Sequence, residues 1–423
     1  MTTPHLSLFA SAVILGYLAL PWCAGCRSSS SSDTPSQRDA DLSVEPRLVT
    51  AVNDLGVRLL KDLARRDPGA NVFVSPASVE LALAMTYNGA GGSTRTAMAK
   101  ALGLDKMTLG EANRANADLL ALLKGIDPEV EIDIANSLWG RQGVAFDDGF
   151  IQRSTASYGA EVRPVDFADQ ASADTINSWV RDKTKGKIAQ LVDHMAIQDA
   201  VLVLVNALYF KGAWSAPFDK HATLDGPFTP LDGKPVTLPM MRQSGKFQYV
   251  ETKDLQAISL PYGAKRMTAY VLLPKPDVKL ADFIAGLTAD SLKKLTAQMT
   301  AQHGMIVLPR FKSDYSTSLK ASLGALGMGS AFTAGADFSG MVKPESLTAL
   351  GGTPLLSDVV HKTALEVNEE GTEAAAATGV VVGVAAMPPE RPFRMTVDRP
   401  FVLILQDSRT GAILFLGSIV RPK

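Results

Sequence analysis

Few side chains in this sequence have the types and spacing that catalysis or metal binding requires. The two cysteines among its 423 residues, Cys23 and Cys26, lie near the N-terminus. The rest of the chain therefore offers neither a thiol nucleophile nor a disulfide framework. The five histidines lack the HExxH spacing of a helical zinc site; they are His5, His194, His221, His303 and His361. We expect no metal and no cofactor.

The motifs of hydrolases are also missing from the sequence. It contains no GxSxG nucleophile elbow and no P-loop, and "NGAGGS" does not have GxGxxG spacing. A Ser-His-Asp triad is defined by a geometry that a sequence does not show. His361 precedes "KTALEVN", a strand-like segment in which a lone histidine is more typical of a buried hydrogen-bonding residue. We therefore expect that the protein is not an enzyme.

Composition and charge exclude further classes of partner. With 46% hydrophobic and 20% charged residues, the chain is typical of a globular protein with a large core. The net charge of -1 and the absence of a dense Lys/Arg run argue against nucleic acid and acidic lipid as partners. The basic residues of the segment 93–125 are scattered, so no heparin site is predicted; they are Arg95, Lys100, Lys106, Arg114 and Lys124.

The N-terminal 44 residues have the pattern of an exported, tethered protein. An apolar run over residues 6–20 is typical of a signal peptide, which we assign to residues 1–26. Ala24 and Gly25 before Cys26 resemble a bacterial lipoprotein box, in which Cys26 is the lipid attachment site. Cys23 departs from that pattern, and ordinary cleaved secretion is the alternative. Residues 27–44 are a Ser-rich, disordered tether, so we expect an extracellular or cell-envelope protein that meets a membrane only through this lipid.

The folded part of the chain must then lie in residues 45–423. Periodic leucines and valines predict an amphipathic helix over residues 48–66. Ser75 and Pro76 are typical of a helix start, and the segment after them is apolar nearly all round, which predicts a buried helix. Another helix is predicted over 175–192, broken near Gly186. The runs 200–212 and 400–420 are β-prone, the second with a turn between Asp407 and Gly411. Helices dominate the first half and strands the second, which predicts one α+β domain.

One segment, "EEGTEAAAATGVVVGVAAMPPE" (residues 369–390), fits neither an ordinary core nor an ordinary loop. If it is extended from Thr372 to Val384, alternation places uncharged small or β-branched residues on one face and Glu373 on the other. Gly371 permits backbone conformations that are closed to other residues, and the two prolines that follow must end any strand. The pattern fits a loop that can enter a sheet, although an ordinary edge strand is the alternative.

Several motifs, in order along residues 45–423, resemble the serpin family of serine protease inhibitors. They are "NVFVSPASVELALAMTYNGAGGSTRTAM", "INSWVRDKTKGKIAQLV", "LVNALYFKGAWSAPF", "ADFSGM", "VHKTALEVNEEGTEAAAATG" and "DRPFVLILQDSRTGAILFLGSIVRP". The resemblance implies a serpin fold with a large central mixed β-sheet, additional sheets, about eight or nine helices and an exposed reactive-centre loop.

The resemblance also implies a mechanism. A protease cleaves a bait bond in the loop and becomes acylated, and the loop from Thr372 to Val384 then inserts into the central sheet and traps it. Family spacing from Glu369 places the bait bond between Ala385 and Ala386. Alanine suits small apolar primary pockets, so elastase-like or subtilisin-like proteases are the predicted partners. A non-inhibitory serpin that acts as a binding or chaperone-like protein is the alternative.

Further residues take roles from the family pattern. The hinge comprises Glu369, Glu370, Gly371, Thr372, Glu373, Ala374, Ala375, Ala376 and Ala377. Its small side chains favour fast insertion and thus an inhibitor. Ser75, Ser78, Asn206 and His361 match a cluster that controls sheet opening. Where the loop enters the sheet, the pattern places Trp214 and an ion pair of Arg310 with Glu369. A metastable, valine-rich loop also predicts self-polymers on heating.

Overall fold

The computed structural model describes residues 43–124, 127–350, 352–372 and 392–423, which form one compact unit. Within these residues, nine α-helices have seven or more residues and two have four. They are α2 (Pro46–Arg66), α3 (Pro76–Tyr87), α4 (Gly92–Leu102), α5 (Leu109–Lys124), α6 (Asp148–Tyr158), α7 (Ala171–Lys183), α8 (His194–Ile197), α9 (Leu280–Gly286), α10 (Ala289–Ala297), α11 (Lys320–Leu323) and α12 (Pro344–Leu350). None of the helices in these ranges is long and apolar enough to cross a bilayer.

The strands of the described ranges form three hydrogen-bonded sheets. They are β1 (Val72–Val74), β2 (Val130–Arg141), β3 (Glu161–Val165), β4 (Leu202–Ala213), β5 (Leu224–Phe228), β6 (Val236–Glu251), β7 (Leu255–Pro261), β8 (Met267–Pro274), β9 (Thr300–Pro309), β10 (Phe311–Ser318), β11 (Val360–Val367), β12 (Gly371–Thr372), β13 (Phe393–Thr396), β14 (Phe401–Asp407) and β15 (Ile413–Ile419). The predicted α+β class, with a large mixed sheet and additional sheets, is confirmed.

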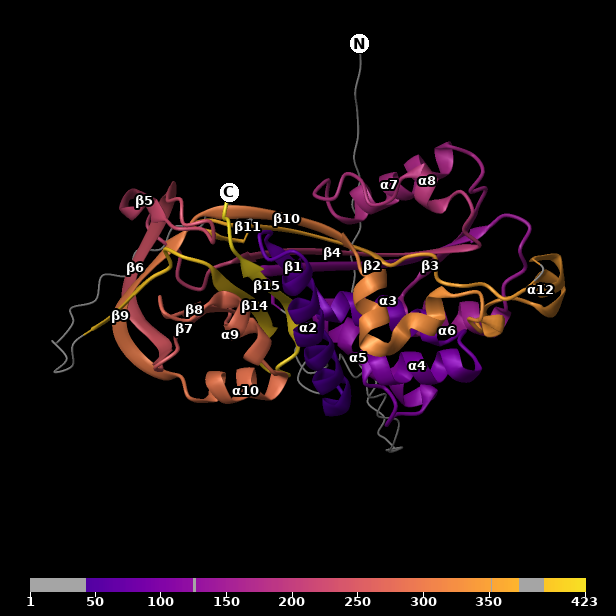
Figure 1. The fold of residues 1–423 in the computed structure, drawn as a ribbon, viewed down its shortest axis with the longest axis horizontal. Coiled ribbons are helices and arrows are strands. Elements are labelled where there is room, and N and C mark those ends of the chain that lie inside the picture. Colours follow the sequence, from indigo (N-terminus) through magenta and orange to yellow (C-terminus); the bar gives the residue numbers. More distant parts are fainter. Residues whose placement is uncertain (1–42, 125–126, 351, 373–391) are drawn as a thin grey trace, which may run out of the picture. The chain divides into compact units, whose positions relative to one another are not determined.

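The largest sheet has nine strands in the order β1-β15-β14-β8-β7-β6-β9-β13, with β5 paired to β6. Its ladders are antiparallel except for β9 with β13. The second sheet has the order β12-β4-β2-β3 and is also mixed, because β2 and β3 run parallel. The third contains only β10 and β11, which are antiparallel. In Figure 1, α7 and α8 lie on one side of β2 and β4, and α3, α5 and α6 lie on the other.

The local signals of the sequence explain the two main helices. Helix α2 begins at Pro46, and its apolar stripe is buried from Leu48 to Leu63. Helix α3 begins after Ser75, whose hydroxyl accepts a hydrogen bond from the backbone N–H of Ser78, and every residue of α3 except Ala82 is buried. The predicted third helix ends at Lys183, before Gly186, which has a φ of 81°. The predicted 400–420 hairpin is β14 and β15.

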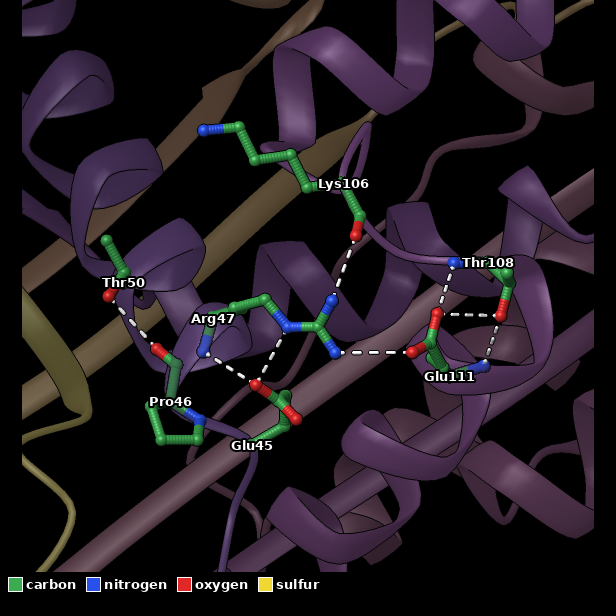
Figure 2. A network of polar contacts seen from close by, with 7 residues as sticks. All are labelled: Glu45, Pro46, Arg47, Thr50, Lys106, Thr108 and Glu111. Carbon is green, nitrogen blue, oxygen red and sulfur yellow. Dashed lines mark hydrogen bonds and ion pairs between the residues drawn. The ribbon is translucent and has the colours of Figure 1, made fainter.

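A polar network joins the starts of α2 and α5 (Figure 2). The guanidinium of Arg47 donates to Glu45 at 2.9 Å, to the carbonyl oxygen of Lys106 at 2.9 Å and to Glu111 at 3.3 Å. The other carboxylate oxygen of Glu111 accepts from the backbone N–H of Thr108 at 2.7 Å and from its hydroxyl at 2.8 Å. These bonds, led by the Thr108 N–H, lower the pKa of Glu111 to about 2. They cap α5 and fix the loop before it.

Candidate functional site

The site is the gap between β4 and β11. Strand β11 pairs with β10 along its whole length, from Ser318↔Val360 to Phe311↔Val367. Strand β4 pairs with β2 on one side, and on the other side it pairs with β12 at Gly212 and Ala213. The two strands are neighbours, yet no ladder joins them in the part of the chain that the structure describes. Facing edges without a ladder are a template for an added strand, here roughly 30 Å long.

The chain itself turns into this gap after β11. Asn368 and Gly371 exchange backbone hydrogen bonds of 2.9 and 3.3 Å, and the side-chain oxygen of Asn368 accepts from the N–H groups of Glu370 and Gly371. This tight turn reverses the chain so that Gly371 and Thr372 form β12 against the end of β4. Thr372, the first residue of the predicted loop, therefore lies inside the sheet, with 1% of its surface exposed.

Gly371 is required at this turn for two reasons. Its φ of 148° belongs to a region that residues with side chains rarely adopt. In addition, a Cβ atom at this position would lie 2.1 Å from the carbonyl oxygen of Gly212. The close approach of the two backbones therefore excludes any other residue unless β12 moves away from β4.

An aromatic layer supports the inserted residue. The hydroxyl oxygen of Tyr262 lies 2.9 Å from Oγ1 of Thr372, and the ring of Tyr262 stacks on Trp214 with centroids 4.3 Å apart. Burial raises the pKa of Tyr262, so its hydroxyl stays neutral. Trp214 donates its indole N–H to the carbonyl oxygen of Asn368 at 2.9 Å, and its backbone N–H to that of Glu370 at 2.9 Å. Trp214 thus contacts the turn through two hydrogen bonds and Tyr262 through ring stacking.

The two acids of the turn are held by Thr223 and Lys220 from the segment that follows β4, and by Arg310 between β9 and β10. The carboxylate of Glu369 lies 3.5 Å from Nη1 of Arg310 and accepts from the hydroxyl of Thr223 at 2.8 Å. Glu369 is buried, whereas the Arg310 side chain is 49% exposed, so solvent screens much of this pair. Lys220 forms an ion pair with Glu370. Turn and segment are therefore fastened to each other by side chains of both.

A second group of polar residues lies at the opposite end of the gap. The backbone N–H of Ser75 donates to Nε2 of His361 at 3.1 Å, so this ring nitrogen must be unprotonated. Burial lowers the pKa of His361 to about 4, which keeps the ring neutral. Ser78, Asn206 and His361 line one cavity of about 30 Å³, a volume that suits a single water molecule.

Asn206 is held differently from the other members of this predicted cluster. Its Nδ2 donates to Oδ1 of Asn136 on β2 at 2.6 Å, and not to Ser75, Ser78 or His361. Its Oδ1 is buried and has no hydrogen-bond partner among the described residues. Asn206 therefore faces the cavity with one unpaired acceptor and ties β4 to β2 with its amide.

The comparisons with known proteins agree with this arrangement. A family model described as Serpin (serine protease inhibitor) matches residues 50–422. The chain belongs to the serpin family.

Relatives of this serpin match it over most of its length. It is 36% identical over 381 residues to Iripin-2 of Ixodes ricinus, covering 89% of this chain and 94% of that protein. It is 35% identical over 389 residues to the leukocyte elastase inhibitor of Bos taurus, covering 89% of this chain and all of that protein.

Solved serpin structures share the fold. The thermophilic serpin tengpin in its native state has a TM-score of 0.82 at 28% identity, covering 90% of this chain and 95% of tengpin. Thyroxine-binding globulin complexed with thyroxine has a TM-score of 0.79 at 28% identity, covering 89% of this chain and all of that one.

Several residues that the sequence predicted for this serpin lie outside the described residues. They are Cys26, Glu373, Ala374, Ala375, Ala376, Ala377, Ala385 and Ala386. Sequence reasoning also missed contacts of the hinge, namely Thr223, Lys220 and Tyr262. Lys220 and Thr223 follow Trp214 closely in the chain and could have been suspected for that reason, whereas no sequence signal marks Tyr262.

Proposed function

We propose that this serpin is a suicide-substrate inhibitor of extracellular serine proteases, cleaved between Ala385 and Ala386. The observation that carries the proposal is the gap between β4 and β11, with Gly371 and Thr372 already paired to β4 at one end. A strand that continues from Thr372 would meet edges of β4 and β11 that no ladder pairs within the described residues. Insertion would then add ladder hydrogen bonds along both edges.

The covalent step follows from the chemistry of serine proteases. The hydroxyl of the catalytic serine attacks the carbonyl carbon of Ala385, an ester bond forms, and the peptide bond to Ala386 breaks. The proton of the hydroxyl passes to the leaving amine of Ala386 through the protease's own base. The protease supplies every catalytic group, and this serpin supplies the bond and the strand.

Insertion of residues 372–384 would then carry the acylated protease roughly 40 Å along the sheet, at about 3.3 Å per residue. Displacement over this distance distorts the protease and stalls hydrolysis of the ester. The alanines from Ala374 to Ala377 favour insertion, because a bulky or charged side chain would have to be desolvated on entering. Alternation places Glu373 on the face opposite to that of Thr372 and Ala374.

Alanine before the bait bond fits elastase-like or subtilisin-like proteases with small apolar primary pockets. The relative named leukocyte elastase inhibitor supports this target class. We place the protein outside the cell or at a bacterial cell envelope, anchored by a lipid on Cys26 after export, or secreted after ordinary cleavage. Self-polymers are the expected side product, since the gap would accept a loop from a second copy.

A non-inhibitory serpin that acts as a binding or chaperone-like envelope protein is the second candidate. The structural likeness to thyroxine-binding globulin, whose structure holds a small molecule, favours it. The small alanine side chains of the hinge argue against it, because a binding protein has no need for fast insertion.

The test mixes the purified chain with pancreatic-type elastase and with subtilisin, followed by denaturing gels and intact mass. We expect a denaturation-resistant complex near the summed masses and a released peptide that begins at Ala386. The matched control is Thr372→Arg, which puts a charge at a position that is 1% exposed. This variant should be cut at the same bond while the protease stays active. Cleavage of the natural chain without a complex would contradict the proposal and favour the binding protein.

A further inference from the structure

A carboxyl group lies fully buried in the middle of α3. Glu80 is 0% exposed, and neither of its side-chain oxygens has a hydrogen-bond partner among the described residues. An ionised carboxylate without partners is among the most costly groups to bury. Helix α3 packs between α5 and α6 on one side and β4 on the other. Solvent therefore does not stabilise a charge on Glu80. The gap mechanism makes no use of Glu80.

The neighbour of Glu80 is an equally unsatisfied acceptor. The side chain of Asn116 on α5 is buried and lies close enough to lower the pKa of Glu80, an effect smaller than the rise that burial causes. Its Nδ2 donates to the carbonyl oxygen of Ala112 at 3.0 Å, and its Oδ1 has no donor in the described part of the chain. Turning the amide over would place its oxygen against the Ala112 carbonyl oxygen. Two acceptors therefore meet in the core, and a hydrogen atom between them would satisfy both.

We propose that Glu80 is a proton-binding site of the folded protein, in which a neutral carboxyl group donates its O–H to Oδ1 of Asn116. The bond joins α3 to α5 inside the helical layer beneath β2 and β4. The ligand is a proton, taken up from solvent when the chain folds at neutral pH.

The surroundings of Glu80 support a neutral acid. Burial raises its pKa to about 8. The ionisable group coupled to it is Tyr158 of α6, whose own pKa is raised by burial and by Glu80; Tyr87 of α3 is coupled to Tyr158 in turn. The hydroxyl of Tyr158 donates to Asn113 of α5 at 2.7 Å and is thus not available to Glu80. None of the other elements that pack on α3 contributes a charged group that shifts the pKa of Glu80.

Helix α3 borders the cavity beside the gap with one face and carries Glu80 on another. Ser78, Val79 and Thr86 of α3 line the cavity beside the gap, whereas Glu80 faces α5. Loss of the proton would leave a buried anion and weaken the packing of α3 beneath the gap. If the proposed function holds, alkaline solution should therefore speed the conversion of the native state into loop-inserted or polymeric forms.

Equilibrium unfolding in denaturant between pH 5 and pH 9 tests the site. A group that binds its proton more tightly when folded makes stability fall as pH rises from its unfolded pKa, near 4.5, to its folded pKa, near 8. In that window the unfolding constant of the natural chain should rise relative to that of Glu80→Gln by about tenfold per pH unit. Glutamine keeps the shape and the donor to Asn116 but cannot titrate. Parallel pH profiles of the two proteins would overturn the proposal.

The control is Glu111→Gln, the same chemical change at an exposed end of α5. The pKa of Glu111 is lowered, so its removal should alter the pH profile only below about pH 4.5. If Glu80→Gln does not fold, infrared spectroscopy of the natural chain decides. A carbonyl band of a protonated carboxyl should persist at pH 7, disappear near pH 8 and shift in Asn116→Ala, and its absence at pH 7 would contradict the site. Neither measurement involves a protease, so failure here is distinct from failure of the inhibitor proposal.

Discussion

The hydroxyl of Tyr262 and Oγ1 of Thr372 lie 2.9 Å apart, which ties the first residue of the loop to the core of the native protein. Both side chains are buried, with 1% of each residue exposed. Their bond holds β12 in the gap before any protease has acted. Withdrawal of Thr372 from β4 would break this bond, so the pair stabilises β12 at the end of β4.

Tyr262→Phe should weaken the attachment of Thr372 to the sheet. The ring would still stack on Trp214, but Oγ1 of Thr372 would lose its partner, at a cost of about 1 kcal/mol. We expect lower stability by that amount and a changed Trp214 fluorescence, because Trp214 is bonded to the same turn. The control is Tyr270→Phe, since the half-buried Tyr270 hydroxyl has no hydrogen bond with any described residue. Equal effects of both substitutions would refute the role of the Tyr262 hydroxyl.

Gly371→Ala should expel β12 from the sheet. The added Cβ would lie 2.1 Å from the Gly212 carbonyl oxygen, and the atoms nearest to it all belong to the backbone of β4, so no side-chain rotation relieves the clash. We expect a stability loss of about 1–3 kcal/mol and, with a protease, more cleaved serpin for each complex formed. Gly233→Ala is the control, because Gly233 also has a positive φ but a Cβ there meets no atom within 4 Å. If Gly371→Ala leaves the ratio of cleaved serpin to complex unchanged, the pairing of Gly371 with β4 has no role in insertion.

The sequence predicted the parts of this site that local patterns determine. Ser75 and Pro76 mark the start of α3, and Gly371 marks a turn with a backbone conformation that other residues rarely adopt. Long-range pairing could not be predicted, since Tyr262 and Thr372 are 110 residues apart and nothing in either segment encodes their contact. The Asn136 partner of Asn206 was missed for the same reason, because it depends on the register of β2 against β4.

Glu369→Lys should loosen the same end of the gap. The substitution removes the acceptor of the Thr223 hydroxyl and places a cation beside Arg310. We expect polymers on native gels after mild heating, at temperatures that leave the natural protein monomeric. The double variant Arg310→Glu, Glu369→Arg restores opposite charges but not the Thr223 bond, so it should recover part of the stability. Identical gels for Glu369→Lys and the natural protein would mean that the pairing has no role in holding the gap closed.

Acid should open the far end of the gap through His361. Its pKa is lowered by burial to about 4, so the unfolded chain, with a pKa near 6.5, binds a proton first. Stability should therefore be complete above about pH 6.5 and decline as the pH falls toward 4, where the folded protein also takes up the proton. Protonation of Nε2 would remove the acceptor of the Ser75 N–H and leave two donors facing each other. His361→Gln should flatten this decline between pH 6.5 and 4, whereas His303→Gln, at an exposed histidine of β9, should preserve it. Unfolding midpoints measured across this pH range test the prediction. If the stability of His361→Gln declines as steeply as that of the natural protein, other groups cause the acid sensitivity.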